Sequence, residues 1–73
     1  MPDIKITSDV AGRVCALPLD VGATVSEGDE VAFVEAMKME IPVASPAAAR
    51  IKSILVAIDD VVAEGQLLVI VET

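Results

Sequence analysis

The residue types that most suggest chemistry lie together near the middle of the chain, in the run 35–40, which reads Glu-Ala-Met-Lys-Met-Glu. The amine of Lys38 is a potential nucleophile, provided that it loses its proton. Met37 and Met39 flank it, and their flexible thioethers offer adaptable apolar contact to a visiting protein. Two methionines beside a lysine add little to stability when they are exposed. The run is therefore interpreted as a functional segment that a second protein recognises.

No other part of the sequence assembles a reactive group. The chain has no histidine and a single cysteine, Cys15, with no base beside it in sequence. It also lacks a metal-binding cluster, a nucleophile–base pair and a phosphate-binding glycine loop, so an enzyme that acts alone is the least favoured reading. Cys15 is predicted to be inert and to lie at a boundary or partly exposed.

Composition and charge narrow the class of protein further. The net charge is −7, with five Lys and Arg against twelve Asp and Glu, which disfavours nucleic acid as a partner. The longest apolar runs have five residues, as in 54–58 and 67–71, whereas a membrane helix needs about 20. The N-terminus lacks a basic segment followed by an apolar block, and one cysteine forms no intrachain disulfide. These features predict a cytoplasmic protein with no membrane association.

An internal repeat organises the whole chain. Shifted by 37 positions, residues 2–36 align with 39–73 without a gap and with nine identities over 35 positions. Arg13 aligns with Arg50, and the Glu-Gly pair at Gly28 aligns with that at Gly65. We therefore predict one domain over residues 1–73, made of the half-repeats 2–36 and 39–73.

Each half-repeat reads as short strands separated by turns. Apolar residues alternate with other residues in the pairs Ile4/Ile6, Ile41/Val43, Val31/Phe33 and Leu68/Ile70, which predicts strands with one buried face. Two copies of such a unit would pack on each other about a pseudo-two-fold axis. The predicted fold is all-β, a flattened barrel-sandwich of two small antiparallel sheets. Phe33 and Ile70 are predicted to lose several kcal/mol on truncation to alanine, provided that they are buried.

The repeat also places Lys38 in space. Met37 and Lys38 are predicted to form the turn of a central hairpin, although they lack the Asn-Gly chemistry that such turns favour. Strain of this kind is a reason to suspect function. The turn aligns with the gap between the chain ends, so Lys38 should lie at one end of the domain and both termini at the other.

The run around Lys38 resembles the attachment motif of a known family. Ala36-Met37-Lys38-Met39, preceded by Glu35, is similar to the biotinylation signature of biotinyl domains of the biotin carboxyl carrier type. The resemblance covers the whole chain, including the half-repeats and the central lysine. Ala49 and Asp59 stand where many members have glycine, which bears on loop detail only.

The resemblance implies a carrier rather than a catalyst. A biotin protein ligase would activate biotin as its acyl-adenylate, and Nζ of Lys38 would form the amide, with Ala36, Met37 and Met39 as the attachment motif. Biotin would then shuttle a carboxyl group between the biotin carboxylase and carboxyltransferase sites of a biotin-dependent carboxylase. Met37 and Met39 either contact the ligase, which is the favoured interpretation, or shield the turn and pack locally. Glu35 and Glu40 either orient the tip or are merely solvated.

Three alternatives stay open at this point. Lipoyl domains share the fold but typically place Asp-Lys-Ala at the tip, so a lipoyl-type acyl carrier is the second reading. A protein that accepts either biotin or lipoate is a variant of it. The third is an unmodified module used for protein contacts only.

Overall fold

The β-branched residues that alternate along the chain form eight short strands in the computed structural model, which describes residues 2–73. None of these residues belongs to a helix long and apolar enough to cross a membrane. The strands are β1 (Asp3–Thr7), β2 (Gly12–Ala16), β3 (Thr24–Val25), β4 (Glu30–Ala36), β5 (Met39–Ala44), β6 (Ala49–Ile54), β7 (Val61–Val62) and β8 (Leu67–Glu72).

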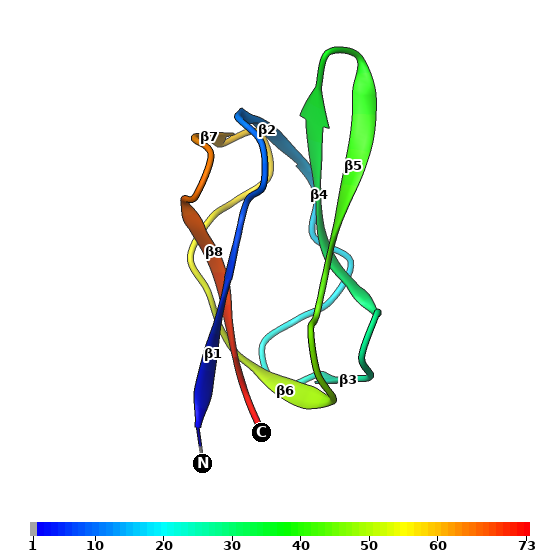
Figure 1. Cartoon of the computed structure of the whole chain (residues 1–73), viewed down its shortest axis with the longest axis vertical. Helices are drawn as coiled ribbons and strands as arrows, with labels where there is room; N and C mark the ends of the chain where they lie inside the picture. Colours follow the sequence, from blue (N-terminus) through cyan, green and yellow to red (C-terminus); the bar gives the residue numbers. More distant parts are fainter. Residues whose placement is uncertain (1) are drawn as a thin grey trace.

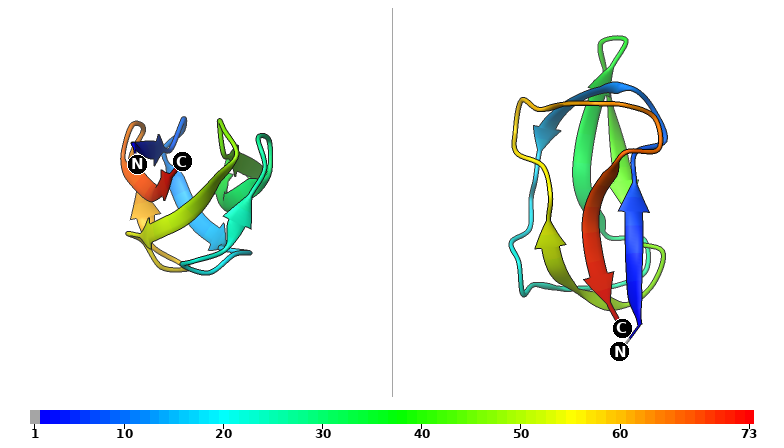
Figure 2. Two further views of the ribbon diagram at one scale, coloured as in Figure 1. Left: turned by 90° about the horizontal axis from the view of Figure 1, so that it is seen from below. Right: turned by 90° about the vertical axis from the view of Figure 1, so that its left-hand side faces the viewer.

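The strands form two antiparallel sheets that face each other (Figure 1, Figure 2). One sheet has the order β1-β8-β6-β3 and the other has the order β5-β4-β2-β7. The shift by 37 residues carries β1 onto β5, β2 onto β6, β3 onto β7 and β4 onto β8, so each sheet maps onto the other. The predicted all-β barrel-sandwich with pseudo-two-fold symmetry is confirmed.

Identical serine and glycine residues of the repeat lock the two halves together. The amide of Gly65 donates a hydrogen bond to the carbonyl of Ser8 at 2.7 Å, and that of Gly28 donates to the carbonyl of Ser45 at 2.9 Å. Both serines are buried, and both glycines have positive φ, 91° at Gly28 and 83° at Gly65. A residue with a side chain is strained in that conformation, which explains the glycine in each turn. Each half therefore secures the turn of the other.

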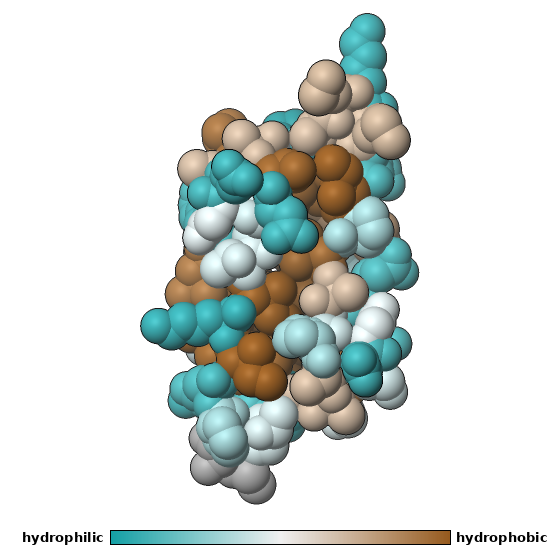
Figure 3. Space-filling model, in the orientation of Figure 1, coloured by the Kyte–Doolittle hydropathy of each residue, from teal (hydrophilic) through white to brown (hydrophobic). Residues whose placement is uncertain are grey.

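The core lies between the sheets and consists of small aliphatic side chains. Some apolar surface is visible along the seam where the two sheets meet (Figure 3). Val14, Val34, Leu68, Val69 and Val71 are fully buried. Val69 and Val71 share a face because alternate residues of a strand point to the same side, and an irregularity in β8 adds Leu68 to that face.

The prediction that Phe33 and Ile70 belong to this buried face is wrong. A β-bulge between Glu30 and Ala32 lets both Val31 and Ala32 point into the core. The alternation then continues from Ala32 to Val34, which turns Phe33 outward, where it is only half-buried. A matching irregularity near Leu68 does the same to Ile70. Truncation of either residue to alanine should therefore lower the free energy of unfolding by less than the several kcal/mol expected for a buried residue.

The long axis of the domain separates two ends. The Cα atoms extend 35 Å along this axis and 17 Å across it. The β4–β5 hairpin projects at one end, and β1 and β8 bring the chain ends together at the other (Figure 1). There the amide of Thr73 donates a hydrogen bond to the carbonyl of Pro2 at 3.1 Å. The predicted placement of Lys38 opposite the termini is confirmed.

Candidate functional site

Lys38 occupies the outermost turn of the β4–β5 hairpin. Ala36 and Met39 are the last cross-strand pair, so Met37 and Lys38 alone connect the strands. Both have positive φ, 51° and 65° respectively. Consecutive left-handed residues are typical of the type I′ turn, which suits the twist of a hairpin but favours Asn and Gly. The predicted strained two-residue turn is confirmed.

The tip is open to solvent. Met37 is 94% exposed and Met39 is 65% exposed, and Lys38 is exposed as well. Within residues 2–73, Lys38 forms no salt bridge and its amine has no hydrogen-bond partner. Nothing in the described chain competes with a second protein for this amine.

The two faces of the hairpin stem differ in chemistry. Glu35 lies directly opposite Glu40, and Ala36 lies opposite Met39 one residue further out. Because side chains alternate along each strand, the two glutamates share the outer face of the sheet and Met39 lies on the other. The stem is therefore acidic on one face and apolar on the other.

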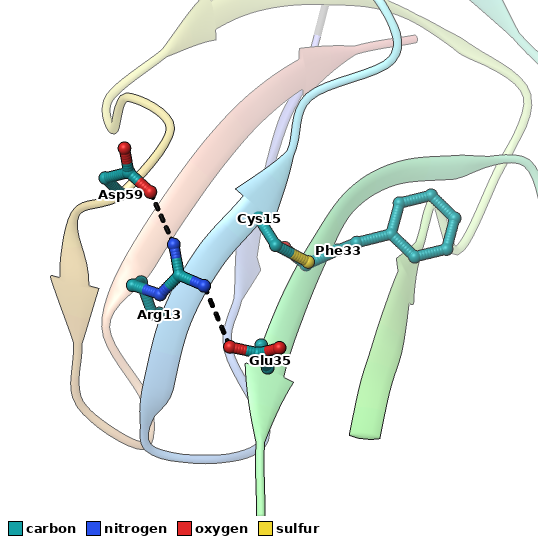
Figure 4. Close-up of polar contacts among 5 residues, drawn as sticks. All are labelled: Arg13, Cys15, Phe33, Glu35 and Asp59. Atoms are coloured by element: carbon teal, nitrogen blue, oxygen red, sulfur yellow. Dashed lines mark hydrogen bonds and ion pairs between the residues drawn. The ribbon is translucent and has the colours of Figure 1, made fainter. Parts of the chain in front are cut away.

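An arginine from β2 ties this stem to the body of the domain. One guanidinium nitrogen of Arg13 donates to the carboxylate of Glu35 at 2.8 Å, and the other donates to Asp59 (Figure 4). The Glu35 carboxylate, followed by that of Asp59, raises the pKa of Arg13 above its ordinary value. Arg13 thus connects the hairpin, β2 and the turn that precedes β7.

Asp59 adopts a conformation that usually belongs to glycine. Its φ is 80°, and its counterpart in the repeat is Gly22, with φ 94°. The amide of Asp59 donates to the carbonyl of Val14 at 2.7 Å, as that of Gly22 donates to Ile51 at 2.8 Å. The two turns are equivalent, and only the turn at Asp59 carries a carboxylate that reaches an arginine.

Gly12 allows β2 to pass close beside β4, its neighbour in the sheet. A Cβ atom at Gly12 would lie 2.3 Å from the carbonyl oxygen of Glu35 and 2.8 Å from Cγ1 of Val34. Side chains other than hydrogen are excluded at such distances. The glycine therefore holds Arg13 within reach of Glu35.

Cys15 lies at the edge of this region but takes no part in it. The thiol is half-buried, and its Sγ atom is 3.4 Å from the carbonyl oxygen of Phe33. The Phe33 ring points away from the Arg13 ion pairs (Figure 4). The predicted partial exposure of Cys15 is confirmed.

The structure brings Ala36, Met37, Lys38 and Met39 together at the tip, as the sequence motif requires. Arg13, Gly12 and Asp59 were not assigned to the site from sequence. The identity of Arg13 with Arg50 and the departure of Asp59 from glycine were the available signals. Among residues 2–73, no group of three or more His, Cys, Asp or Glu side chains could hold a metal ion.

Comparison with known proteins identifies a biotin/lipoyl attachment domain, the type that the motif around Lys38 resembles. Residues 2–71 match the family profile described as "Biotin-requiring enzyme". The chain is 31% identical to the biotinylated protein TB7.3 homolog of Mycobacterium leprae and covers 99% of that protein. It is also 31% identical to the biotin/lipoyl attachment protein of Bacillus subtilis, of which it covers 89%.

Larger proteins contain a similar segment. The chain is 37% identical to part of the mitochondrial propionyl-CoA carboxylase alpha chain of Sus scrofa, but it spans only 9% of that protein. The urea carboxylase structure of Kluyveromyces lactis superposes with a TM-score of 0.92 at 30% identity, over 97% of this chain and 6% of that one. The similarity to carboxylases is therefore confined to one small segment of each.

Proposed function

We propose that this chain, which belongs to the biotin/lipoyl attachment family, carries biotin as an amide on Nζ of Lys38 and acts as a carboxyl carrier. The observation that carries the proposal is the free amine of Lys38 at the outermost turn, opposite the chain ends. Biotin supplies a ureido ring that accepts and releases a carboxyl group.

The residues present fit an attached group of this kind. The exposed Lys38 amine has no competing partner among residues 2–73, so its modification leaves no buried charge unpaired. A lysine amine is protonated at neutral pH, so a biotin protein ligase must remove a proton before Nζ attacks the biotinyl adenylate, forms the amide and releases AMP. The protein charge then falls from −7 to −8 because one cation is lost.

The domain itself contributes tethering and presentation rather than catalysis. The hairpin projects from one end of the domain and the chain ends lie at the other, so a partner can approach Lys38 without meeting the chain ends. Attachment raises the effective concentration of the carried group at a biotin carboxylase and a carboxyltransferase site. Cys15 is a free thiol, which suits a reducing compartment, and we place the protein in the cytoplasm.

A lipoyl group on Lys38 is the second candidate function. It is favoured by the similarity to the Bacillus subtilis protein named for both attachments. Met37 and Met39 argue against it, since they flank Lys38 as in the biotin motif. The mass of the attached group distinguishes biotin from lipoate.

Intact mass spectrometry of the chain produced with an active biotin protein ligase tests the proposal. We expect one biotin-sized addition, absent from Lys38→Arg and retained in Lys52→Arg, a matched change of another surface lysine. The melting temperature of Lys38→Arg should equal that of the wild type, because an exposed turn buries little apolar area. A lipoyl-sized addition supports the second function. An unmodified wild-type chain, or biotin on Lys38→Arg, contradicts the proposal.

A further inference from the structure

The pseudo-two-fold axis provides an internal reference for the charges around Lys38. Two cross-strand rows on the outer faces of the sheets correspond residue by residue. The lysine-end row consists of Val61, Arg13, Glu35 and Glu40. The terminal row consists of Thr24, Arg50, Glu72 and Asp3.

Both acidic residues of the terminal row have a cationic partner. Arg50 forms an ion pair with Glu72, and Nζ of Lys52 lies 2.9 Å from a carboxylate oxygen of Asp3. Glu72 and Asp3 are directly opposite each other, and like charges in that position repel. The two cations offset this repulsion, so the row is balanced.

The lysine-end row is not balanced. Arg13 pairs with Glu35, but Cys15 replaces the second cation, since it aligns with Lys52. Glu40 therefore has no salt bridge within residues 2–73, although it faces Glu35 across the strands. Arg13 is the one cation of this row, and it is shared between Glu35 and Asp59. The fold does not require this arrangement, because the terminal row shows the balanced alternative.

Glu40 also lies where a protein that modifies Lys38 must come close. Nucleophilic attack requires the reacting atoms to approach to about 3–3.5 Å. The Cα atoms of Glu40 and Lys38 are two residues apart, a separation of at most about 7 Å. The enzyme that forms the bond to Nζ must therefore lie close to the hairpin stem. A carboxylase acts on the ureido ring at the far end of the biotin arm, so its active site need not approach Glu40 as closely.

We propose that Glu40 is a docking residue for the biotin protein ligase and pairs with an arginine or lysine of that enzyme on the outer face of the hairpin. This inference rests on the proposed function and adds a specificity-determining residue to it. The ligase surface then has a basic side chain against the Glu40 face and an apolar wall against the Met39 face. Docking supplies the cation that the terminal row obtains from Lys52.

Steady-state kinetics of biotin attachment test this role. The unmodified chain is incubated with a purified biotin protein ligase, biotin and ATP, and initial rates are measured against chain concentration. Glu40→Gln should raise the KM for the chain roughly fivefold, and Glu40→Lys more than about tenfold, with little change in kcat. Glu40→Asp keeps the charge and should retain most of the affinity. The KM of the wild type should rise with NaCl concentration, and less steeply in Glu40→Gln.

Asp3 provides the matched control, because it is the counterpart of Glu40 at the far end. Asp3→Asn and Asp3→Lys should leave the KM unchanged. If Glu40 only stabilised the fold, Glu40→Gln would lower the melting temperature. On the docking role the substitution removes the repulsion with Glu35 and should keep or raise the melting temperature.

The outcomes separate the two proposals. A wild-type KM in Glu40→Lys, or an equal rise in Asp3→Lys, overturns the docking role and leaves biotin attachment standing. A wild-type chain that accepts no biotin overturns the proposed function and the docking role with it.

Discussion

The two ends of the domain share one backbone plan and differ in what they do with it. At the terminal end, strands β1 and β8 stop beside each other, and Arg50 and Lys52 balance the acidic residues of the row. At the lysine end, the equivalent strands β5 and β4 continue into a strained turn. The shared parts are what the fold requires. The differences at Gly12, Cys15, Asp59 and the turn itself are therefore candidates for function.

The sharpest difference in packing is between Gly12 and its counterpart Ala49. We expect Gly12→Ala to lower the free energy of unfolding by about 3 kcal/mol, because its methyl group would collide with the Glu35 carbonyl. Ala49→Gly, the matched change, should lower it by about 1 kcal/mol through chain entropy. The chain has no Trp or Tyr, so urea unfolding is followed by circular dichroism. Equal effects at the two positions would mean that the close approach is not special to the lysine end.

Asp59 and Gly22 test how much the Arg13 contact contributes. Asp59→Gly relieves a left-handed side-chain residue, which should raise the free energy of unfolding by up to about 1 kcal/mol once salt screens the ion pair. At low salt the lost ion pair should offset most of this gain. The reciprocal Gly22→Asp adds backbone strain without a steric clash, so it should destabilise at high salt. At low salt an ion pair with Arg50, the counterpart of Arg13, should offset most of this loss. A stabilising Gly22→Asp would contradict the assignment.

The smallest expected effect is a pH dependence at the terminal end, where Lys52 pairs with Asp3. The hydrogen bond to Asp3 raises the pKa of Lys52 above its ordinary value of 10.5. Folding therefore favours the protonated lysine, and its contribution is present below pH 10.5 and is lost as the pH rises through the raised value. Lys52→Met should flatten the fall in melting temperature measured in this range. An unchanged slope would show that the exposed pair contributes nothing measurable.

The repeat made most of the architecture predictable from sequence. It placed the strands, the pseudo-two-fold axis and Lys38 at a tip opposite the chain ends, because aligned halves must adopt the same backbone. The bulge at Val31 was missed, since one extra residue in a strand changes no property of composition. Phe33 was consequently assigned to the wrong face.

The surroundings of Lys38 were less predictable than Lys38 itself. The Arg13–Asp59 ion pair joins residues 46 positions apart, and only the paired sheet brings them together. The role of Gly12 depends on the distance between two strands, which a sequence pattern does not encode. The repeat therefore predicts the backbone architecture, whereas individual side-chain contacts between distant strands are not predictable from the sequence.

The bond from Gly65 to Ser8 has a consequence for how this chain is synthesised. It joins residues near opposite ends of the chain, as does the pairing of β1 with β8. Such contacts form only after the last strand of the domain has left the ribosome, so the two sheets close later than any local hairpin forms. The β4–β5 hairpin is local and can form earlier, but its Arg13 support waits for the turn at Asp59. In a nascent chain the hairpin that carries Lys38 can therefore form before the Arg13 ion pairs that support it.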